Sequence, residues 1–159
     1  MTIKKDCAII LEVIILEDIM TDTKREVLHM EDSNLAKLNV TRGENLVEIY
    51  VQNNNITELD LTANLKLEVL DCTGNPIKKF KACAPGGNGV FLIEIGAAKG
   101  GTIAVKYGPG YQTYIATPDE GYEFSYWVNE LGDMASREAV FEDTYGAARL
   151  LIAWFRQAR

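Results

Sequence analysis

A step of 21 residues repeats through the first half of this chain and constrains its fold more than any other feature. The segment NLVEIYVQNNNITELDLTANLK (residues 45–66) is followed by LEVLDCTGNPIKKFKAC (residues 67–83), and apolar residues and one asparagine fall at matching places in both. One step earlier, REVLHMEDSNLAKLNVTRGE (residues 25–44) fits the same frame, with Ser33 in place of the asparagine. A further step back fails at the asparagine position. The sequence therefore predicts three consecutive units that begin near Arg25.

The shared frame, L-x-x-L-x-L-x-x-N-x-I-x-x-L-x-L, indicates short strands stacked on one another. Apolar positions that alternate with period two turn toward one side of a strand. The chain then turns at the asparagine, and the later apolar residues return to the same interior. One unit cannot bury that side alone, whereas stacked units form one core. We expect Asn54 and Asn75 to lie inside the turns and to pair backbone groups, each of which would cost about 1–3 kcal/mol if buried unpaired.

This frame resembles the leucine-rich repeat over roughly residues 25–84, and it most resembles the short-period, cysteine-containing repeats of bacterial surface proteins. The resemblance implies a solenoid of three units over residues 25–86, with residues 1–24 as an N-terminal cap. Three units are close to the minimum for a stable solenoid, so the end caps would contribute substantially. Cys72 occupies an apolar position of the frame, and we expect it to be a small core residue.

The second half of the chain has a different pattern. The sequence APGGNG (residues 84–89) interrupts the repeat with proline and glycine, and we place a domain boundary there. Short apolar runs separated by glycine turns follow, which predicts a small antiparallel sheet of about seventy residues. The expected strands are Val90–Ile95, Thr102–Tyr107, Gln112–Thr117 and a closing run, Ala148–Phe155.

The block ATPDEGYEFSYW (residues 116–127), preceded by GGTIAV and followed by a terminal IAWF, resembles the divergent internalin-type B-repeat domain. The resemblance covers about residues 89–156 and implies a compact β-grasp-like fold. We expect three aromatic residues of the block to build its core, Tyr122, Phe124 and Trp127. The two halves together predict a mainly β or α+β chain, a short leucine-rich-repeat solenoid followed by a small antiparallel β-grasp-like domain.

The charge of the chain argues against two classes of partner. A net charge of -7 and a pI near 4.8 do not provide the basic face that nucleic acid or an anionic membrane surface requires. No segment approaches the ~18 apolar residues of a membrane span. We therefore expect no nucleic-acid partner and no membrane insertion. The start, MTIKKDCAIILEVIILEDIM (residues 1–20), is interrupted by Glu12 and lacks a small-residue cleavage site, so we expect neither a signal peptide nor an anchor in this chain.

Residues that commonly carry catalysis are scarce. His29 is the only histidine, which removes most Ser–His–Asp and Cys–His arrangements and every histidine-rich metal set. The 21-residue step places His29, Tyr50 and Asp71 in one column with adjacent rungs about 4.8 Å apart. His29 and Asp71 would then lie about 10 Å apart, too far for a base and its orienting acid. The three cysteines lack the spacing of a zinc site. We expect no enzyme, no metal and no cofactor.

The strand face of the three units remains as the candidate site. Side chains on either side of each buried strand residue turn outward and form three columns. A preformed platform of this kind loses little entropy on binding. Tyr50 lies at its centre, and tyrosine is a residue type that often dominates interface energetics. The candidate ligand-binding residues are His29, Glu31, Glu48, Tyr50, Gln52, Asp71 and Thr73, beside the outward positions of Val27 and Val69.

The combination of these two modules resembles the one found in internalin-like bacterial surface proteins. The resemblance implies non-enzymatic protein recognition or adhesion at the cell surface or outside the cell, with a host surface protein or glycan as partner. Two alternatives stay open. The chain could be a structural spacer, in which case changes to the strand face would alter no binding. It could instead bind carbohydrate through second-half tyrosines, of which Tyr107, Tyr111 and Tyr114 are the candidates for a sugar-stacking patch.

Overall fold

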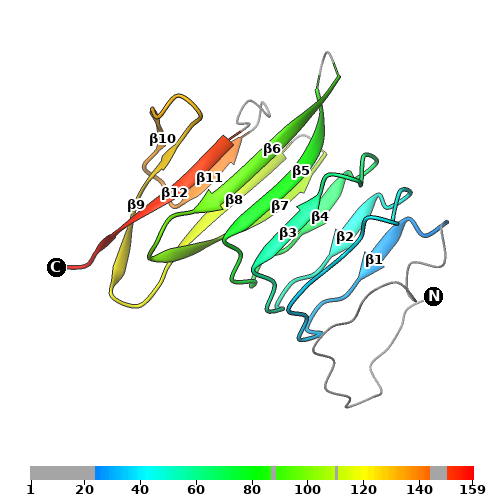
Figure 1. The fold of residues 1–159 in the computed structure, drawn as a ribbon, viewed down its shortest axis with the longest axis horizontal. Helices are drawn as coiled ribbons and strands as arrows, with labels where there is room; N and C mark the ends of the chain where they lie inside the picture. The colour runs from blue at the N-terminus through cyan, green and yellow to red at the C-terminus, as the bar shows by residue number, and fades with distance from the viewer. Residues whose placement is uncertain (1–23, 87–88, 110, 144–149) are drawn as a thin grey trace.

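The computed structural model describes residues 24–86, 89–109, 111–143 and 150–159 (Figure 1). Within these residues the chain forms twelve strands and no helix. The expectation of a mainly β chain is therefore confirmed, and the described residues provide no helix for the alternative α+β class. The predicted cap lies outside the described residues, apart from Lys24.

The strands of the first half are short and those of the second half are mostly long. Their bounds are β1 (Val27–His29), β2 (Glu48–Tyr50), β3 (Glu58–Leu61), β4 (Val69–Asp71), β5 (Lys79–Gly86), β6 (Gly89–Ala97), β7 (Gly101–Gly108), β8 (Tyr111–Pro118), β9 (Tyr122–Val128), β10 (Met134–Ser136), β11 (Val140–Asp143) and β12 (Leu150–Gln157).

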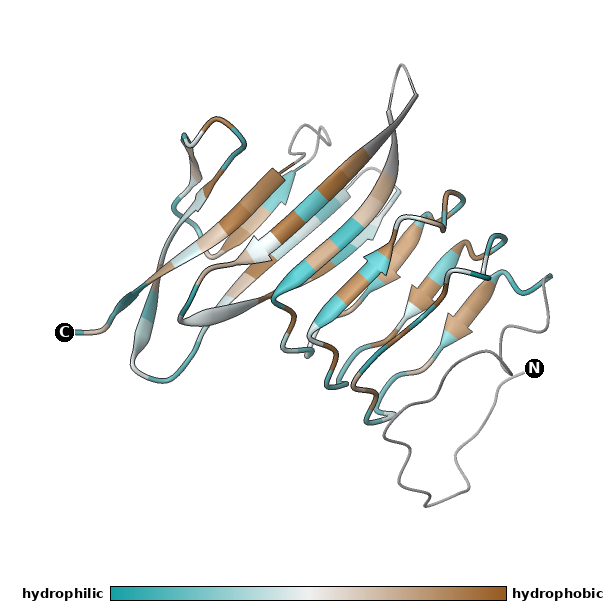
Figure 2. Ribbon diagram, in the orientation of Figure 1, coloured by the Kyte–Doolittle hydropathy of each residue, from teal (hydrophilic) through white to brown (hydrophobic). Residues whose placement is uncertain are grey.

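Two six-stranded sheets enclose the core. The order in the first sheet is β1-β2-β4-β7-β8-β11, and the order in the second sheet is β10-β9-β12-β6-β5-β3. Apolar and polar residues alternate along β5 and β6 (Figure 2), which gives the second sheet one buried face and one exposed face. The short strands stack at the end of the molecule where the described chain begins, and the long strands lie at the other end (Figure 1).

The 21-residue step of the sequence is the register of the parallel strand pairs. Leu28 lies beside Ile49, and Ile49 lies beside Leu70, in the ladder β1-β2-β4 of the first sheet. The same step relates Leu59 to Phe80 in the β3–β5 pair of the second sheet. All five side chains are buried. Residues that are 21 positions apart therefore lie side by side in the buried faces of both sheets. Cys72 is also buried and belongs to this core, as expected.

The chain turns in the same way in each unit. Asp32, Asn53 and Gly74, which are 21 residues apart, have φ angles of 50°, 55° and 71°. Only residues that tolerate the left-handed region sit comfortably there, and Asp, Asn and Gly are the types that do. At Gly74 a Cβ would lie 2.3 Å from the Asn53 Oδ1 of the preceding unit. The turn therefore needs glycine at that position for space as well as for conformation.

Asn54 lies inside the turn that follows β2, as predicted. Its Oδ1 accepts hydrogen bonds from the backbone N–H groups of Ser33 (3.0 Å) and Leu35 (2.9 Å) in the preceding unit. Its Nδ2 donates to the backbone oxygens of Met30 (2.8 Å) and Val51 (2.9 Å). One buried amide thus links two units by pairing four backbone groups that the turn removes from water.

Asn75 makes equivalent hydrogen bonds one unit later. Asn64 has a related role at the other end of the short strands β1 to β4, which we call the rungs. Asn75 accepts from Ile56 N at 3.1 Å and donates to Val51 O at 2.8 Å. Asn64 donates to the backbone oxygens of Val40 (3.0 Å) and Gly43 (2.9 Å). The repeat frame predicted the part played by Asn75 and did not include Asn64.

Both sheets continue across the predicted domain boundary. Of the predicted boundary, residues 84–86 belong to β5 and Gly89 belongs to β6, and these two strands pair antiparallel in the second sheet. In the first sheet, β4 pairs antiparallel with β7, with Asp71 beside Lys106. The predicted division therefore does not coincide with a break in either sheet.

The expectation of one small antiparallel sheet for the second half is wrong. Strands β7, β8 and β11 belong to the first sheet, whereas β6, β9, β10 and β12 belong to the second, where β12 runs parallel to β6. This division brings Tyr114 of β8 against Trp127 of β9, with ring centroids 6.4 Å apart. Both side chains are buried, and a single sheet would have left its aromatic face without a cover.

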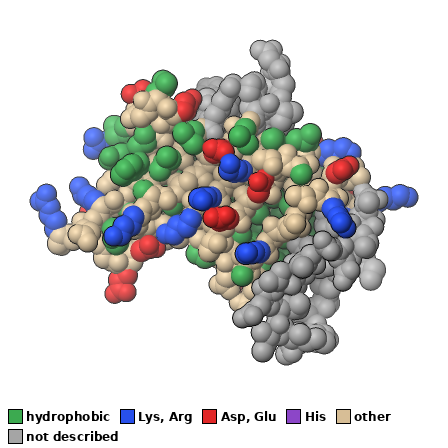
Figure 3. Space-filling model, viewed as in Figure 1, with side chains coloured by type: hydrophobic (Ala, Val, Ile, Leu, Met, Phe, Trp, Pro, Cys, Tyr) green, Lys and Arg blue, Asp and Glu red, His purple; other side chains and the backbone are tan. Residues whose placement is uncertain are grey.

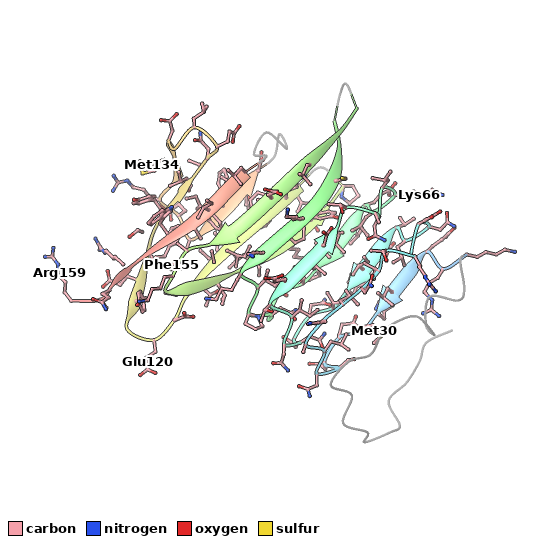
Figure 4. All side chains as sticks on the ribbon, in the orientation of Figure 1. Met30, Lys66, Glu120, Met134, Phe155 and Arg159 are labelled. Atoms are coloured by element: carbon pink, nitrogen blue, oxygen red, sulfur yellow. The ribbon has the colours of Figure 1, made fainter. Side chains whose placement is uncertain are left out.

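Trp127 is the centre of the second-half core, as expected. Phe124 contacts it with a centroid separation of 5.9 Å, and Phe155 of β12 packs edge-on against Phe124. The Trp127 Nε1 donates to the Glu138 backbone oxygen at 3.1 Å, which satisfies its one polar group. Tyr122 and Phe124 are partly buried against this core. In Figure 4, Phe155 and Met134 mark the long-strand end of the molecule, and Met30 and Lys66 mark the rungs.

Candidate recognition surface

The outer face of the first sheet carries the predicted strand-face residues. Leu28, Ile49 and Leu70 point into the core, so the residues before and after each of them turn outward. The predicted column of His29, Tyr50 and Asp71 is a row of side chains that crosses the sheet from strand to strand. Strand pairing extends this row beyond β4 into the second half of the chain. This central row runs through His29, Tyr50, Asp71, Lys106, Thr113 and Glu142.

His29 and Tyr50 form a parallel stack in the central row. Their ring centroids are 4.8 Å apart and their planes differ by 7°, which matches the rung spacing expected for neighbouring strands. The His29 Nδ1 lies 2.8 Å from Glu31 Oε1. Two rings and a carboxylate are thus held against one another on the surface before any partner binds.

Tyr50 also orients Glu48. Its hydroxyl donates a hydrogen bond of 2.9 Å to Glu48 Oε2. This bond to Glu48 is the main cause of a raised pKa of Tyr50, with burial and the charges of Glu48, Tyr111 and Asp71 adding to it. Glu48 has no other polar side-chain contact in the part of the chain that the structure describes. Its second carboxylate oxygen has no donor among the described residues.

Asp71 differs from its expected place in an exposed column, because it is only 8% exposed. Burial alone would raise the pKa of Asp71, but hydrogen bonds from Thr73 and the nearby Lys106 ammonium outweigh it, and the net pKa is lowered. The Thr73 hydroxyl donates to Asp71 Oδ1 at 2.7 Å, and Lys106 Nζ lies 3.1 Å from Oδ2. Asp71 therefore joins the two halves of the sheet and is a poor contact for a ligand.

Gln52 and Thr73 occupy the next outward row. Gln52 is partly buried, and its Oε1 has no hydrogen-bond partner among the described residues. Thr73 is committed to Asp71 through both its hydroxyl and its backbone N–H. Of the seven predicted ligand-binding residues, the structure links four through side-chain contacts, namely His29, Glu31, Glu48 and Tyr50. It leaves Gln52 partly buried in the next row and directs Asp71 and Thr73 toward each other.

The three candidate sugar-stacking tyrosines do not share a surface. Tyr114 is 1% exposed and belongs to the core, and burial raises its pKa and that of Tyr107. Tyr111 is 43% exposed on the outer face. Its ring covers Gly108, where a Cβ would lie 2.7 Å from ring atoms. The expected patch reduces to Tyr111, which lies near Tyr50.

Lys106 and Tyr111 were not predicted for this surface. Alternation along VKYGPGYQTY (residues 105–114) does separate them from Tyr107 and Tyr114, so the sequence contained a signal for which residues share a face. It contained no signal that β7 would pair with β4, because that contact joins segments more than thirty residues apart.

The outer face of the second sheet has a different character. Figure 3 shows side chains of both signs at its middle and hydrophobic side chains gathered toward the β9–β10–β12 end. The charged pairs are exposed, with Lys81 Nζ 2.6 Å from Glu94 Oε1 and Lys79 Nζ 3.5 Å from Glu58 Oε1. A groove of about 620 Å³ lies beside them, between residues 36–39 and β3. The exposed apolar side chains include Leu92, Tyr126, Met134 and Trp154.

Searches for two other kinds of site were negative. In the described ranges, no group of three or more His, Cys, Asp or Glu residues could hold a metal ion. Those residues also include no helix with the length and apolarity to cross a membrane. Burial raises the pKa of the Cys72 thiol to about 12, so this cysteine stays protonated at neutral pH and is not a reactive thiolate.

The sequence was compared with models of protein families, with curated proteins and with solved structures, and none of the three comparisons gave a match. The geometry of the described residues therefore carries the functional argument.

Proposed function

We propose that this chain is a non-enzymatic recognition module that binds a protein partner through the outer face of the first sheet. The observation that carries this proposal is the cluster around Tyr50. Stacked His29 and Tyr50 rings, the Glu48 carboxylate and the exposed Tyr111 ring are held on a rigid sheet. Ordered aromatic side chains of this kind bind with little loss of conformational freedom.

We also propose that the stacked rungs are a short leucine-rich-repeat solenoid. Parallel pairing at a 21-residue register and the two asparagines that link neighbouring units support this assignment. A B-repeat relationship of residues 89–156 and a place at a bacterial cell surface are further proposals, which rest on the sequence resemblance alone.

The test is binding of the fluorescently labelled full chain to cultured epithelial cells and to purified mucin. The variant Tyr50→Ala/Tyr111→Ala removes both tyrosine rings from the proposed face. A matched control, Tyr126→Ala/Trp154→Ala, removes two exposed rings from neighbouring strands of the second sheet. Circular dichroism and thermal unfolding would establish that each variant is folded.

We expect the first variant to lose binding by tenfold or more and the control to retain it. Equal binding by both would contradict the proposed face, and loss in the control alone would move recognition to the second sheet. Absence of binding by the unaltered chain would favour the spacer. Loss of binding after enzymatic deglycosylation of the mucin would favour a carbohydrate ligand, for which the exposed Tyr111 ring is the supporting feature.

A further inference from the structure

The outer face of the first sheet has a charge imbalance that the second sheet lacks. The central row, together with Glu31 and Glu48 beside it, carries four carboxylates and one ammonium group. They are Glu31, Glu48, Asp71, Glu142 and Lys106. Lys106 is already engaged with Asp71 at 3.1 Å. On the second sheet, by contrast, Glu58 and Glu94 each have a lysine within 4 Å. Charge complementarity on the first sheet therefore favours a cationic partner.

Glu48 is the best placed of these carboxylates. The Tyr50 hydroxyl fixes one of its oxygens, and no lysine or arginine contacts the group in the described part of the chain. A carboxylate that is already oriented loses little freedom when it accepts a donor from a ligand.

Two aromatic rings lie on the same face as this carboxylate, and the hydroxyl of one of them, Tyr50, is bonded to it. Tyr50 is held in place by the stack with His29, and Tyr111 is held across Gly108. Tyr111 lies close enough to Tyr50 to affect the ionisation of its hydroxyl. The faces of tyrosine rings attract ammonium and guanidinium groups within about 6 Å. A carboxylate on the same face as such rings is suited to the charged end and the apolar stem of one basic side chain.

On the basis of the proposed function, we propose that the outer face of the first sheet binds a cationic polypeptide segment. A lysine or arginine of that segment lies against the Glu48 carboxylate and contacts the rings of Tyr50 and Tyr111. The residues that recognise the charge thus come from a rung strand and from a long strand, so the site exists only when the two halves share one sheet.

The test uses the full chain, labelled with ¹⁵N, and three capped synthetic peptides in which threonine alternates with lysine, glutamine or glutamate. Amide chemical shifts locate binding, and the titration gives Kd. Glu48→Gln removes the charge and keeps an acceptor for Tyr50. Glu120→Gln is the matched control, because it makes the same charge change in the exposed β8–β9 turn (Figure 4). Tyr111→Leu removes the ring and keeps an apolar cover over Gly108, while Tyr111→Phe keeps the ring.

We expect the lysine peptide to shift amides of β2, β7 and β8, with little effect of the glutamine and glutamate peptides. Glu48→Gln should raise Kd by about three- to tenfold, Tyr111→Leu by about threefold, and Glu120→Gln and Tyr111→Phe should leave it nearly unchanged. Equal weakening by Glu48→Gln and Glu120→Gln, or shifts spread over both sheets, would overturn the proposal by showing attraction to overall charge. No lysine-peptide binding together with Tyr50-dependent binding to cells would overturn the cationic partner and leave the recognition face intact.

Discussion

The rungs and the long strands hold their parts of the core by different means. In the rungs, strands of three or four residues are joined by buried asparagine amides that reach from one unit to the next. In the second half, strands of seven to nine residues enclose large aromatic side chains, and most of their polar pairing is along the backbone ladders. Short strands cannot pair enough of their own backbone, so side chains complete the pairing.

Trp127→Ala should have the largest effect, because it removes the central side chain of the aromatic core. We expect a loss of about 3–5 kcal/mol in the free energy of unfolding, measured by urea titration. Both sheets run through both halves, so the rungs and the long strands should unfold in one transition. Hydrogen exchange that kept the amides of β1 and β2 protected while those of β9 and β12 opened would show that the two regions are separate.

Leu59→Ala tests the same coupling from the rung end. Leu59 lies in β3 beside Phe80 of β5 and is buried in the core, and its truncation should cost about 2–5 kcal/mol. In the Leu59→Ala variant, hydrogen exchange of backbone amides should become faster in the long strands and in the rungs together. Rates that changed only in residues 24–83 would indicate that the short strands unfold alone.

Asn54→Ala tests the amide links. The change leaves buried backbone groups unpaired, and we expect a loss of about 2–3 kcal/mol from the free energy of unfolding. Asn55→Ala is a suitable control, because Asn55 is exposed and its side chain contacts only that of Asn34. Similar urea midpoints for the two variants would mean that the amide links contribute little and that packing alone holds the units together.

Asp71→Asn examines the junction between the two regions. The pKa of Asp71 is lowered from its ordinary value of 3.8, so the folded state binds its proton less readily than the unfolded state does. The resulting stabilisation is fully present above the ordinary carboxyl pKa and is lost as pH falls through the folded pKa. We expect the variant to be about 1–2 kcal/mol less stable at pH 7 and the difference to shrink below about pH 4. A difference independent of pH would contradict this role.

The smallest effect should come from the exposed pair of Lys81 and Glu94 on the second sheet. Although these groups are 2.6 Å apart, both are exposed, so Lys81→Ala should change the free energy of unfolding by little more than the error of the measurement. Urea titration at low and high salt would measure it. A larger loss would show that the β5–β6 hairpin depends on this pair more than on its ladder.

Prediction from the sequence succeeded where information was local and repeated. The positions of Asn54 and Asn75 within their turns followed from one frame, and so did the neighbouring places of His29 and Tyr50. Burial of Trp127 followed from its type and its neighbours. The prediction was wrong for Tyr114 and Asp71, whose burial depends on strands that pair with them from distant parts of the chain.

By itself, the sequence determined the rung spacing, the turns, the inward residues of each unit and the long strands of the second half, because alternation and turn chemistry act within a few residues. It did not indicate the short strands β10 and β11. Only the tertiary structure decided how the strands of the second half divide between two sheets and that β7 joins β4. That choice depends on covering two apolar faces at once, which is a property of the whole core and of no single segment. The meeting of Tyr50, Glu48 and Tyr111 on one surface is a consequence of it.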